Sequence, residues 1–190
     1  MKRAVFYILF FCVIFANINA DEPPIHITEI ISQNNQFKLN LKNTINENNS
    51  FIENWELIKI DTNEVIYDFI CNQFSLSGLK VFISDDGKNI ALVNWFLYVN
   101  WRNENNQSIK NKTVIRFFFL GEEIKKYKLA DVFGDINRGV RSVSHLQWTG
   151  YNHDRNSIIM ENGHIIIKTL ESFEYRFNVN NGDIINRRRI

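Results

Sequence analysis

The architecture of this chain follows from one stretch, Val81-Phe-Ile-Ser-Asp-Asp-Gly-Lys-Asn-Ile-Ala-Leu-Val93. Two apolar runs flank Asp85-Asp86-Gly87, and residues of these types tolerate the positive φ of a hairpin turn. A second pair of strand-like runs follows over residues 114–129, with a turn at Gly121-Glu122. The stretch and its continuation therefore predict an antiparallel unit of about four strands, the content of one propeller blade.

The same pattern recurs on both sides of this central copy. The first copy spans residues 31–41 and 55–69, and the last spans residues 158–167 and 173–185. In the first copy Asn34-Asn35 stands where the central copy has its turn glycine. Three copies of one hairpin unit predict an all-β fold of propeller-like antiparallel hairpin repeats, with about three blade-like units.

Three units are fewer than the roughly 4–8 blades that close a propeller ring, so two architectures stay open. One is an open, curved stack of sheets, and the other is part of a ring that a second copy completes. Residues 128–134 predict one short helix, because Leu129, Val132 and Phe133 share a face. Residues 43–50 and 100–112 are rich in Asn and are expected to be loops.

The N-terminus predicts a secretory signal peptide over residues 1–20. Lys2 and Arg3 precede an unbroken apolar stretch of 13 residues, Ala4 to Ala16, and Ala20 supplies a small residue at the cut. A membrane-spanning helix needs roughly 20 apolar residues, so this segment favours cleavage over anchoring. We therefore expect an exported protein, periplasmic or extracellular, with a single β-rich domain over residues 21–190 and no membrane anchor after cleavage.

Charge and cysteine content narrow the classes of partner. Without Lys2 and Arg3 the 22 basic residues of the chain become 20, against 21 acidic ones, so no global field attracts nucleic acid. Residues 187–189, three consecutive arginines, predict a solvated end of the last strand or a contact for an acidic partner. Cys71 has no second cysteine to pair with after processing and predicts a buried, inert thiol.

The order of these pieces resembles a family of short exported bacterial proteins with propeller-like β repeats and no assigned function. The resemblance covers most of residues 75–187, and its first repeat departs from the pattern by lacking the turn glycine. It implies a propeller-like fold and export, and it brings no catalytic residues. The segments that carry it are residues 81–88, 94–95, 114–119, 129–133, 142–148, 163–167 and 182–184.

One segment concentrates chemically active side chains. His145, His153 and Asp154 could bind a transition metal, or could act as a base and its orienter. Their spacing does not place ligands on one helix face, and residues 150–155 read as a polar loop, so no metal, cofactor or catalytic residue is predicted. Aromatic residues are the other candidates, as a platform for sugars or peptides or simply as core. The candidate ligand-binding residues are Trp101, His145, Trp148, Tyr151, His153 and Asp154.

The function predicted from these observations is a non-catalytic binding or scaffold module for an envelope protein or glycan. The first alternative is a metal-dependent or His/Asp hydrolase that uses the loop over residues 145–154. The second is a self-associating structural protein, a homo-oligomer in which two copies complete one ring. Fold alone does not separate these functions.

Overall fold

The computed structural model describes residues 29–45, 51–71, 78–150 and 154–190. The predicted signal peptide, Tyr151 and His153 lie outside these ranges. None of the helices within them has the length and hydropathy that crossing a membrane requires.

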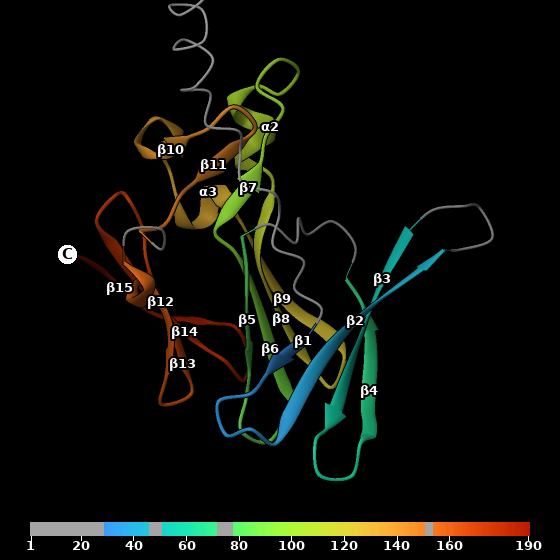
Figure 1. Cartoon of the computed structure of the whole chain (residues 1–190). Helices are drawn as coiled ribbons and strands as arrows, with labels where there is room; N and C mark the ends of the chain where they lie inside the picture. The colour runs from blue at the N-terminus through green and yellow to red at the C-terminus, as the bar shows by residue number, and fades with distance from the viewer. Residues whose placement is uncertain (1–28, 46–50, 72–77, 151–153) are drawn as a thin grey trace, which may run out of the picture.

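Three four-stranded antiparallel sheets form the body of the molecule, and in each the strands pair in chain order apart from one excursion (Figure 1). The first sheet, blade 1, contains β1 (Glu29–Ile31), β2 (Phe37–Ile45), β3 (Phe51–Lys59) and β4 (Glu64–Ile70). Blade 2 contains β5 (Leu79–Ile83), β6 (Asn89–Asn94), β8 (Thr113–Phe119) and β9 (Glu122–Lys128). Blade 3 contains β12 (Ile158–Glu161), β13 (His164–Lys168), β14 (Phe173–Asn178) and β15 (Ile184–Arg189). The predicted all-β, propeller-like fold with three blade-like units is confirmed.

A fourth sheet was not predicted. It has the strand order β10 (Val140–Arg141), β11 (His145–Gln147) and β7 (Phe96–Tyr98). The β7 strand leaves blade 2 between β6 and β8, whereas β10 and β11 lie in the segment that connects blade 2 to blade 3. Figure 1 shows this small sheet with both α-helices at the top of the molecule, beyond one end of the three blades.

The helices confirm one prediction and correct another. Helix α3 (Leu129–Val132) lies within the predicted helical segment. The prediction of a loop over residues 100–112 is wrong where α2 (Asn106–Lys110) forms, because Asn105 caps it by accepting the N–H of Ser108 at 2.8 Å. The loop predicted over residues 43–50 is also wrong at its start, since residues 43–45 continue β2 and pair with β3. Two 3₁₀ turns, η1 (Ile136–Arg138) and η2 (Arg155–Ser157), complete the described elements.

Strand β6 divides the interior into two hydrophobic cores and is buried along its whole length. Successive side chains of a strand point to opposite faces, so Ile90 and Leu92 join the core shared with blade 1. Ala91 and Val93 join the larger core shared with blade 3 and the small sheet. This position explains the near-continuous apolar run in β6, which is typical of a strand covered on both faces. Cys71 is buried in the first core, as predicted.

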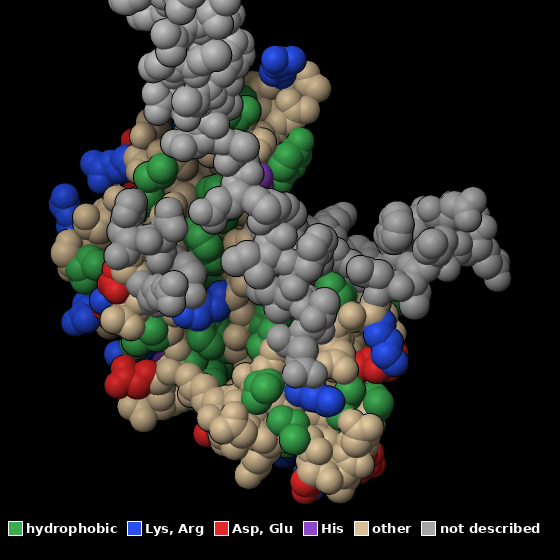
Figure 2. All heavy atoms as spheres, in the orientation of Figure 1, with side chains coloured by type: hydrophobic (Ala, Val, Ile, Leu, Met, Phe, Trp, Pro, Cys, Tyr) green, Lys and Arg blue, Asp and Glu red, His purple; other side chains and the backbone are tan. Residues whose placement is uncertain are grey.

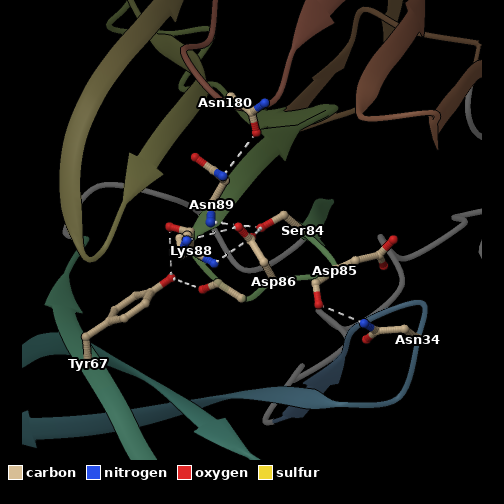
Figure 3. A network of polar contacts seen from close by, with 9 residues as sticks. Asn34, Tyr67, Ser84, Asp85, Asp86, Lys88, Asn89 and Asn180 are labelled. Atoms are coloured by element: carbon tan, nitrogen blue, oxygen red, sulfur yellow. Dashed lines mark hydrogen bonds and ion pairs between the residues drawn. The ribbon is translucent and has the colours of Figure 1, made fainter.

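The turn between β5 and β6 is held by its own side chains (Figure 3). Ser84 Oγ donates to Asp86 Oδ1 at 2.7 Å and accepts the N–H of Asn89 at 2.9 Å. Gly87 adopts a φ of 71°, the left-handed region that glycine enters without steric cost. The turn is therefore specified by residues within six positions of one another.

The turn between β1 and β2 repeats this arrangement without a glycine. Ser32 Oγ donates to Asn34 Oδ1 at 2.8 Å and accepts the N–H of Phe37 at 2.9 Å. Asn35 takes the left-handed position with a φ of 57°, which Asn tolerates better than most other residues. The substitution of Asn for Gly seen in the first repeat therefore preserves the turn.

Blades 1 and 2 are joined through this pair of turns (Figure 3). Asn34 Nδ2 donates to the Asp85 carbonyl at 2.8 Å. From the outer strand of blade 1, the Tyr67 hydroxyl donates to the Gly87 carbonyl at 2.8 Å. Burial and the nearby Asp86 carboxylate both raise the pKa of Tyr67, so the hydroxyl keeps the proton that it donates. The blade contact is thus made by defined polar bonds as well as by apolar packing.

Blades 2 and 3 are joined in a related way. Asn89 Nδ2 donates to Asn180 Oδ1 at 3.1 Å, and the Tyr127 hydroxyl donates to the Gly182 carbonyl at 2.7 Å. Tyr127 lies on the outer strand of blade 2, as Tyr67 lies on the outer strand of blade 1. Each of these tyrosines therefore ties its blade to a glycine-containing turn of the following blade.

Side chains from the other two blades cover part of the inner edge of blade 3. Lys80 Nζ from β5 donates to the Ile158 carbonyl at 2.5 Å, and Gln33 Nε2 from blade 1 donates to the Met160 carbonyl at 3.4 Å. Carbonyls two residues apart on a strand point to the same side, here the side away from β13. These donors satisfy backbone acceptors that an added strand would otherwise use.

The three consecutive arginines lie on β15, which is exposed along its length. The Arg187 guanidinium stacks 4.3 Å from the ring centroid of Phe173, and Arg188 Nη2 lies 2.8 Å from Glu174 Oε1. Two of the three arginines are thus held against their own blade, which favours the predicted solvated strand end.

Candidate binding site

The structure separates the candidate ligand-binding residues. His145 belongs to β11 of the small sheet, and Trp101 bonds to Ser142, three residues before it. The Asp154 side chain instead caps η2 by accepting the N–H of Asn156 at 2.9 Å. Trp148 is fully buried, and its indole N–H donates to the Asn94 carbonyl at 2.7 Å. The prediction that Trp148 contacts a ligand is corrected, because its ring is part of the core.

His145 is held within the small sheet by aromatic contacts. Its ring stacks on Phe96 with centroids 4.4 Å apart and planes 6° from parallel, and Tyr98 meets it edge-on at 5.7 Å. Its Nδ1 atom lies 2.9 Å from Ser144 Oγ. The described residues hold no group of three or more His, Cys, Asp or Glu side chains that could bind a metal ion. The hydrolase alternative stays a prediction, because His153 lies outside the described residues.

Trp101 is half-buried and fixed from two sides. Its indole N–H donates to the Ser142 carbonyl at 3.0 Å, and the Arg141 guanidinium lies 4.8 Å from the ring centroid. A guanidinium over an aromatic face is an attractive contact. The Trp101 ring is therefore held in place by β10 and the residue after it. The sequence did not predict this contact.

The Trp101 ring lines a surface depression of about 400 Å³, here called the Trp101 depression, whereas His145 is not among the lining residues. Val143 and Tyr98 supply its exposed apolar surface, with 84 % and 52 % of their surface accessible. Val143 was missed from the sequence, although an apolar residue isolated between Ser142 and Ser144 is a signal that could have found it. The lining residues are Tyr98, Val99, Asn100, Trp101, Arg102, Asn103, Val143 and Ser144.

The backbone beneath the depression is held by Glu104. Its Oε1 accepts the N–H of Asn100 at 2.9 Å, and its Oε2 lies 2.8 Å from Lys112 Nζ. Burial by itself raises the pKa of Glu104, but the hydrogen bond from Lys112, the Asn100 N–H and the Lys112 charge together hold this pKa below its ordinary value. The ionised carboxylate thus connects the two ends of the segment over residues 100–112.

This segment is expected to loosen in acid. A carboxyl whose pKa is lowered by folding stabilises the folded state above its unfolded pKa, and the stabilisation is lost as the pH falls through the folded pKa. The Asn100 amide resonance should therefore shift as the pH falls below about 4, which is lower than the ordinary pKa of Glu. NMR titration of the wild type and Glu104→Gln checks this, because the variant should lack the transition. Identical titrations would contradict the role of Glu104.

The charge around the depression is positive. Residues 98–112 contain three basic side chains, Arg102, Lys110 and Lys112, against the single acid Glu104. Residues 135–145 add Arg138 and Arg141 against one acid, Asp135, whose Oδ2 lies 4.0 Å from Arg138 Nε. The depression therefore combines exposed apolar surface with a positively charged surrounding, although the whole chain is nearly neutral.

Comparison with known proteins places the chain in no family. No protein-family model matches it, and no curated protein matches it. Similar solved structures include the Dos1 propeller and the Cps50 (Swd1) β-propeller domain of Myceliophteria thermophila, and each similarity covers 85 % of the chain. Their TM-scores are 0.43 and 0.39, with sequence identities of 9 % and 11 %. The chain spans 33 % and 42 % of the lengths of these two structures.

Proposed function

We propose that this protein is a non-catalytic binding module of the cell envelope, and that the Trp101 depression receives an apolar side chain from an acidic protein segment. The observation that carries the proposal is Val143, whose side chain is 84 % exposed on a backbone that its neighbours hold in place. Export and an envelope location rest on the predicted signal peptide and belong to the same proposal.

The apolar surface favours a protein partner over a glycan. Val143 and Tyr98 present aliphatic and aromatic surface side by side, which suits the desolvated centre of a protein interface. A sugar instead stacks on an open aromatic face, and the Trp101 ring already carries the Arg141 guanidinium over it. A glycan ligand is thus the less favoured occupant.

The charge of the surrounding surface selects the partner further. Arg102 and Arg141 lie beside the depression, and both are exposed. Complementary charge accelerates encounter and suppresses binding of partners with the same sign. A partner segment with Asp or Glu next to its apolar anchor fits this surface best.

The proposal is tested by capture from an envelope extract on three immobilised proteins: the wild type, Val143→Glu and Val65→Glu. Val65 is the matched control, because it is an exposed valine on blade 1, outside the depression. Loss of an interface anchor should lower recovery of the partner by about tenfold or more for Val143→Glu alone. Recovery should also fall at high salt, which screens exposed charges.

Quantitative mass spectrometry and glycan analysis of the captured material decide the outcome. A protein with an acidic segment that Val143→Glu loses and Val65→Glu retains supports the proposal. Equal recovery of every protein by all three variants would contradict it, as would specific loss of a glycan in place of a protein. Far-ultraviolet circular dichroism confirms that both variants remain folded.

A further inference from the structure

A pocket of about 490 Å³ opens where turns from all three blades meet. Blade 1 contributes Gln33, blade 2 contributes Asp85 and Asp86, and blade 3 contributes Asn162 and Asn180. Its volume lies within the roughly 300–1,000 Å³ typical of small-molecule sites. The pocket shares no lining residue with the Trp101 depression.

The walls of this three-blade pocket are tied to one another. Gln33 reaches the Met160 carbonyl of blade 3, and Asn34 bonds the Asp85 carbonyl of blade 2. Asn180 accepts from Asn89 of blade 2 at 3.1 Å (Figure 3). Because every blade is bonded to another at the rim, the pocket exists only in the assembled stack.

The described residues that line the pocket include two carboxylates, and none of these residues is basic. Asp86 folds back onto its own turn, where Oδ1 accepts from Ser84 Oγ and from the Lys88 N–H, and Lys88 Nζ lies 3.7 Å from Oδ2. Figure 3 shows the Asp85 side chain extending away from these contacts. Asp85 is exposed, and its bond to Asn34 uses the main-chain carbonyl, so its carboxylate is available to a ligand.

We infer that the three-blade pocket binds a ligand through a primary ammonium group. Asp85 supplies the opposite charge, whereas the charge of Asp86 is offset by Lys88, whose Nζ lies 3.7 Å from its Oδ2. The amides of Gln33, Asn162 and Asn180 offer donors and acceptors to the polar groups beside the ammonium. Such a ligand has two chemical sources, an amino sugar and the side chain of a lysine residue.

Four soluble probes distinguish recognition of the ammonium charge from recognition of the rest of the ligand. They also distinguish a saccharide ligand from a peptide ligand. Glucosamine and N-acetylglucosamine share a ring and differ in the ammonium, and Nα-acetyl-lysine amide and Nα-acetyl-norleucine amide form the equivalent pair for a peptide. Saturation-transfer NMR and calorimetry at low salt measure binding to the purified protein. At least one ammonium probe should bind at millimolar concentration. The affinity of its neutral analogue should be lower by about tenfold or more.

Two charge-matched variants locate the site. Asp85→Asn should weaken the ammonium probe by about tenfold, whereas Asp68→Asn, on the outer strand of blade 1, should leave its affinity unchanged. Asp85→Asn retains the main-chain bond to Asn34, so its unfolding temperature should match the wild type. Its recovery of the protein partner at the Trp101 depression should also be unchanged, which keeps this test independent of the proposed function.

Each outcome decides the inference. Binding of glucosamine alone identifies a saccharide source, binding of the lysine probe alone identifies a peptide source, and either result supports an ammonium site. Equal binding of charged and neutral probes would overturn it. So would unchanged affinity in folded Asp85→Asn, or no binding of either ammonium probe at millimolar concentration.

Discussion

Gly182→Ala is expected to lower the free energy of unfolding by about 3 kcal/mol, the sum of backbone strain and overpacking. Gly182 has a φ of 72°, which L-residues with a Cβ rarely adopt. An added Cβ would also lie 2.7 Å from Lys125 Cβ and 2.8 Å from the Phe117 ring of blade 2. Because its carbonyl accepts from Tyr127, a displaced turn would strain the contact between blades 2 and 3 as well.

Gly163→Ala is the matched control for this prediction. Gly163 has a φ of 71°, nearly that of Gly182, yet no atom of the described residues lies within 4 Å of an added Cβ. Only the backbone cost remains, about 1 kcal/mol. Urea unfolding measures the free energy of unfolding of both variants. The difference between them is the cost of the clash between the added Cβ of residue 182 and blade 2. Equal losses in the two variants would contradict this docking of the blades.

Trp148→Ala is expected to destabilise the protein by about 3–5 kcal/mol, the range for removal of a large buried aromatic side chain. The Trp148 ring is fully enclosed in the larger core, which blade 2 shares with blade 3 and the small sheet. The variant would also leave the Asn94 carbonyl without its indole donor. Thermal unfolding followed by circular dichroism measures the loss. Trp148→Phe gives a milder, folded comparison if the alanine variant does not fold.

Trp101→Ala is the control that separates stability from binding. The Trp101 ring is only half-buried, so its removal should cost much less stability while removing one wall of the Trp101 depression. Capture of the proposed partner should therefore fall in this variant although the fold persists. An unfolding midpoint for Trp148→Ala equal to that of the wild type would contradict the assignment of Trp148 to the core.

The hairpin turns could be predicted because their physics is local. Asp85-Asp86-Gly87 shows a left-handed position and its side-chain acceptors within a few residues, and the structure contains that turn. Asn34-Asn35 was recognised as the equivalent of this turn despite its missing glycine. Three such hairpin units were enough to predict the number of blades.

The small sheet could not be predicted for the converse reason. Its β7 and β11 strands have three residues each, too few to show a period of two, and they pair across about fifty positions of sequence. The burial of the aromatic residues also depends on that pairing. Trp101 and Trp148 both have polar neighbours in sequence, so the local sequence does not distinguish a surface ring from a core ring. Only the fold places one at the surface and the other in the core.

The ring-completion alternative stays a prediction, because the end blades of the stack carry both charged and apolar side chains. The outward face of blade 1 has an ion pair between Lys42 and Glu56 at 2.6 Å, and blade 3 ends with the pair of Glu174 and Arg188. Ile70 on blade 1 and Ile185 on blade 3 are also exposed. A blade that packs against another presents apolar side chains, so a light-scattering mass of the purified protein is needed to test this alternative.

The strand order has a consequence for the way this protein folds during its synthesis. Blades 1 and 3 are made of neighbouring segments of chain, so each of their hairpins closes a short loop at small entropic cost and within microseconds. The Gln33–Met160 contact instead joins residues 127 positions apart. A polypeptide that appears N-terminus first at about 5–20 residues per second can thus complete blade 1 seconds before blade 3 exists. The three-blade pocket would then form only after blade 3 has folded, and its presence would mark the assembly of all three blades.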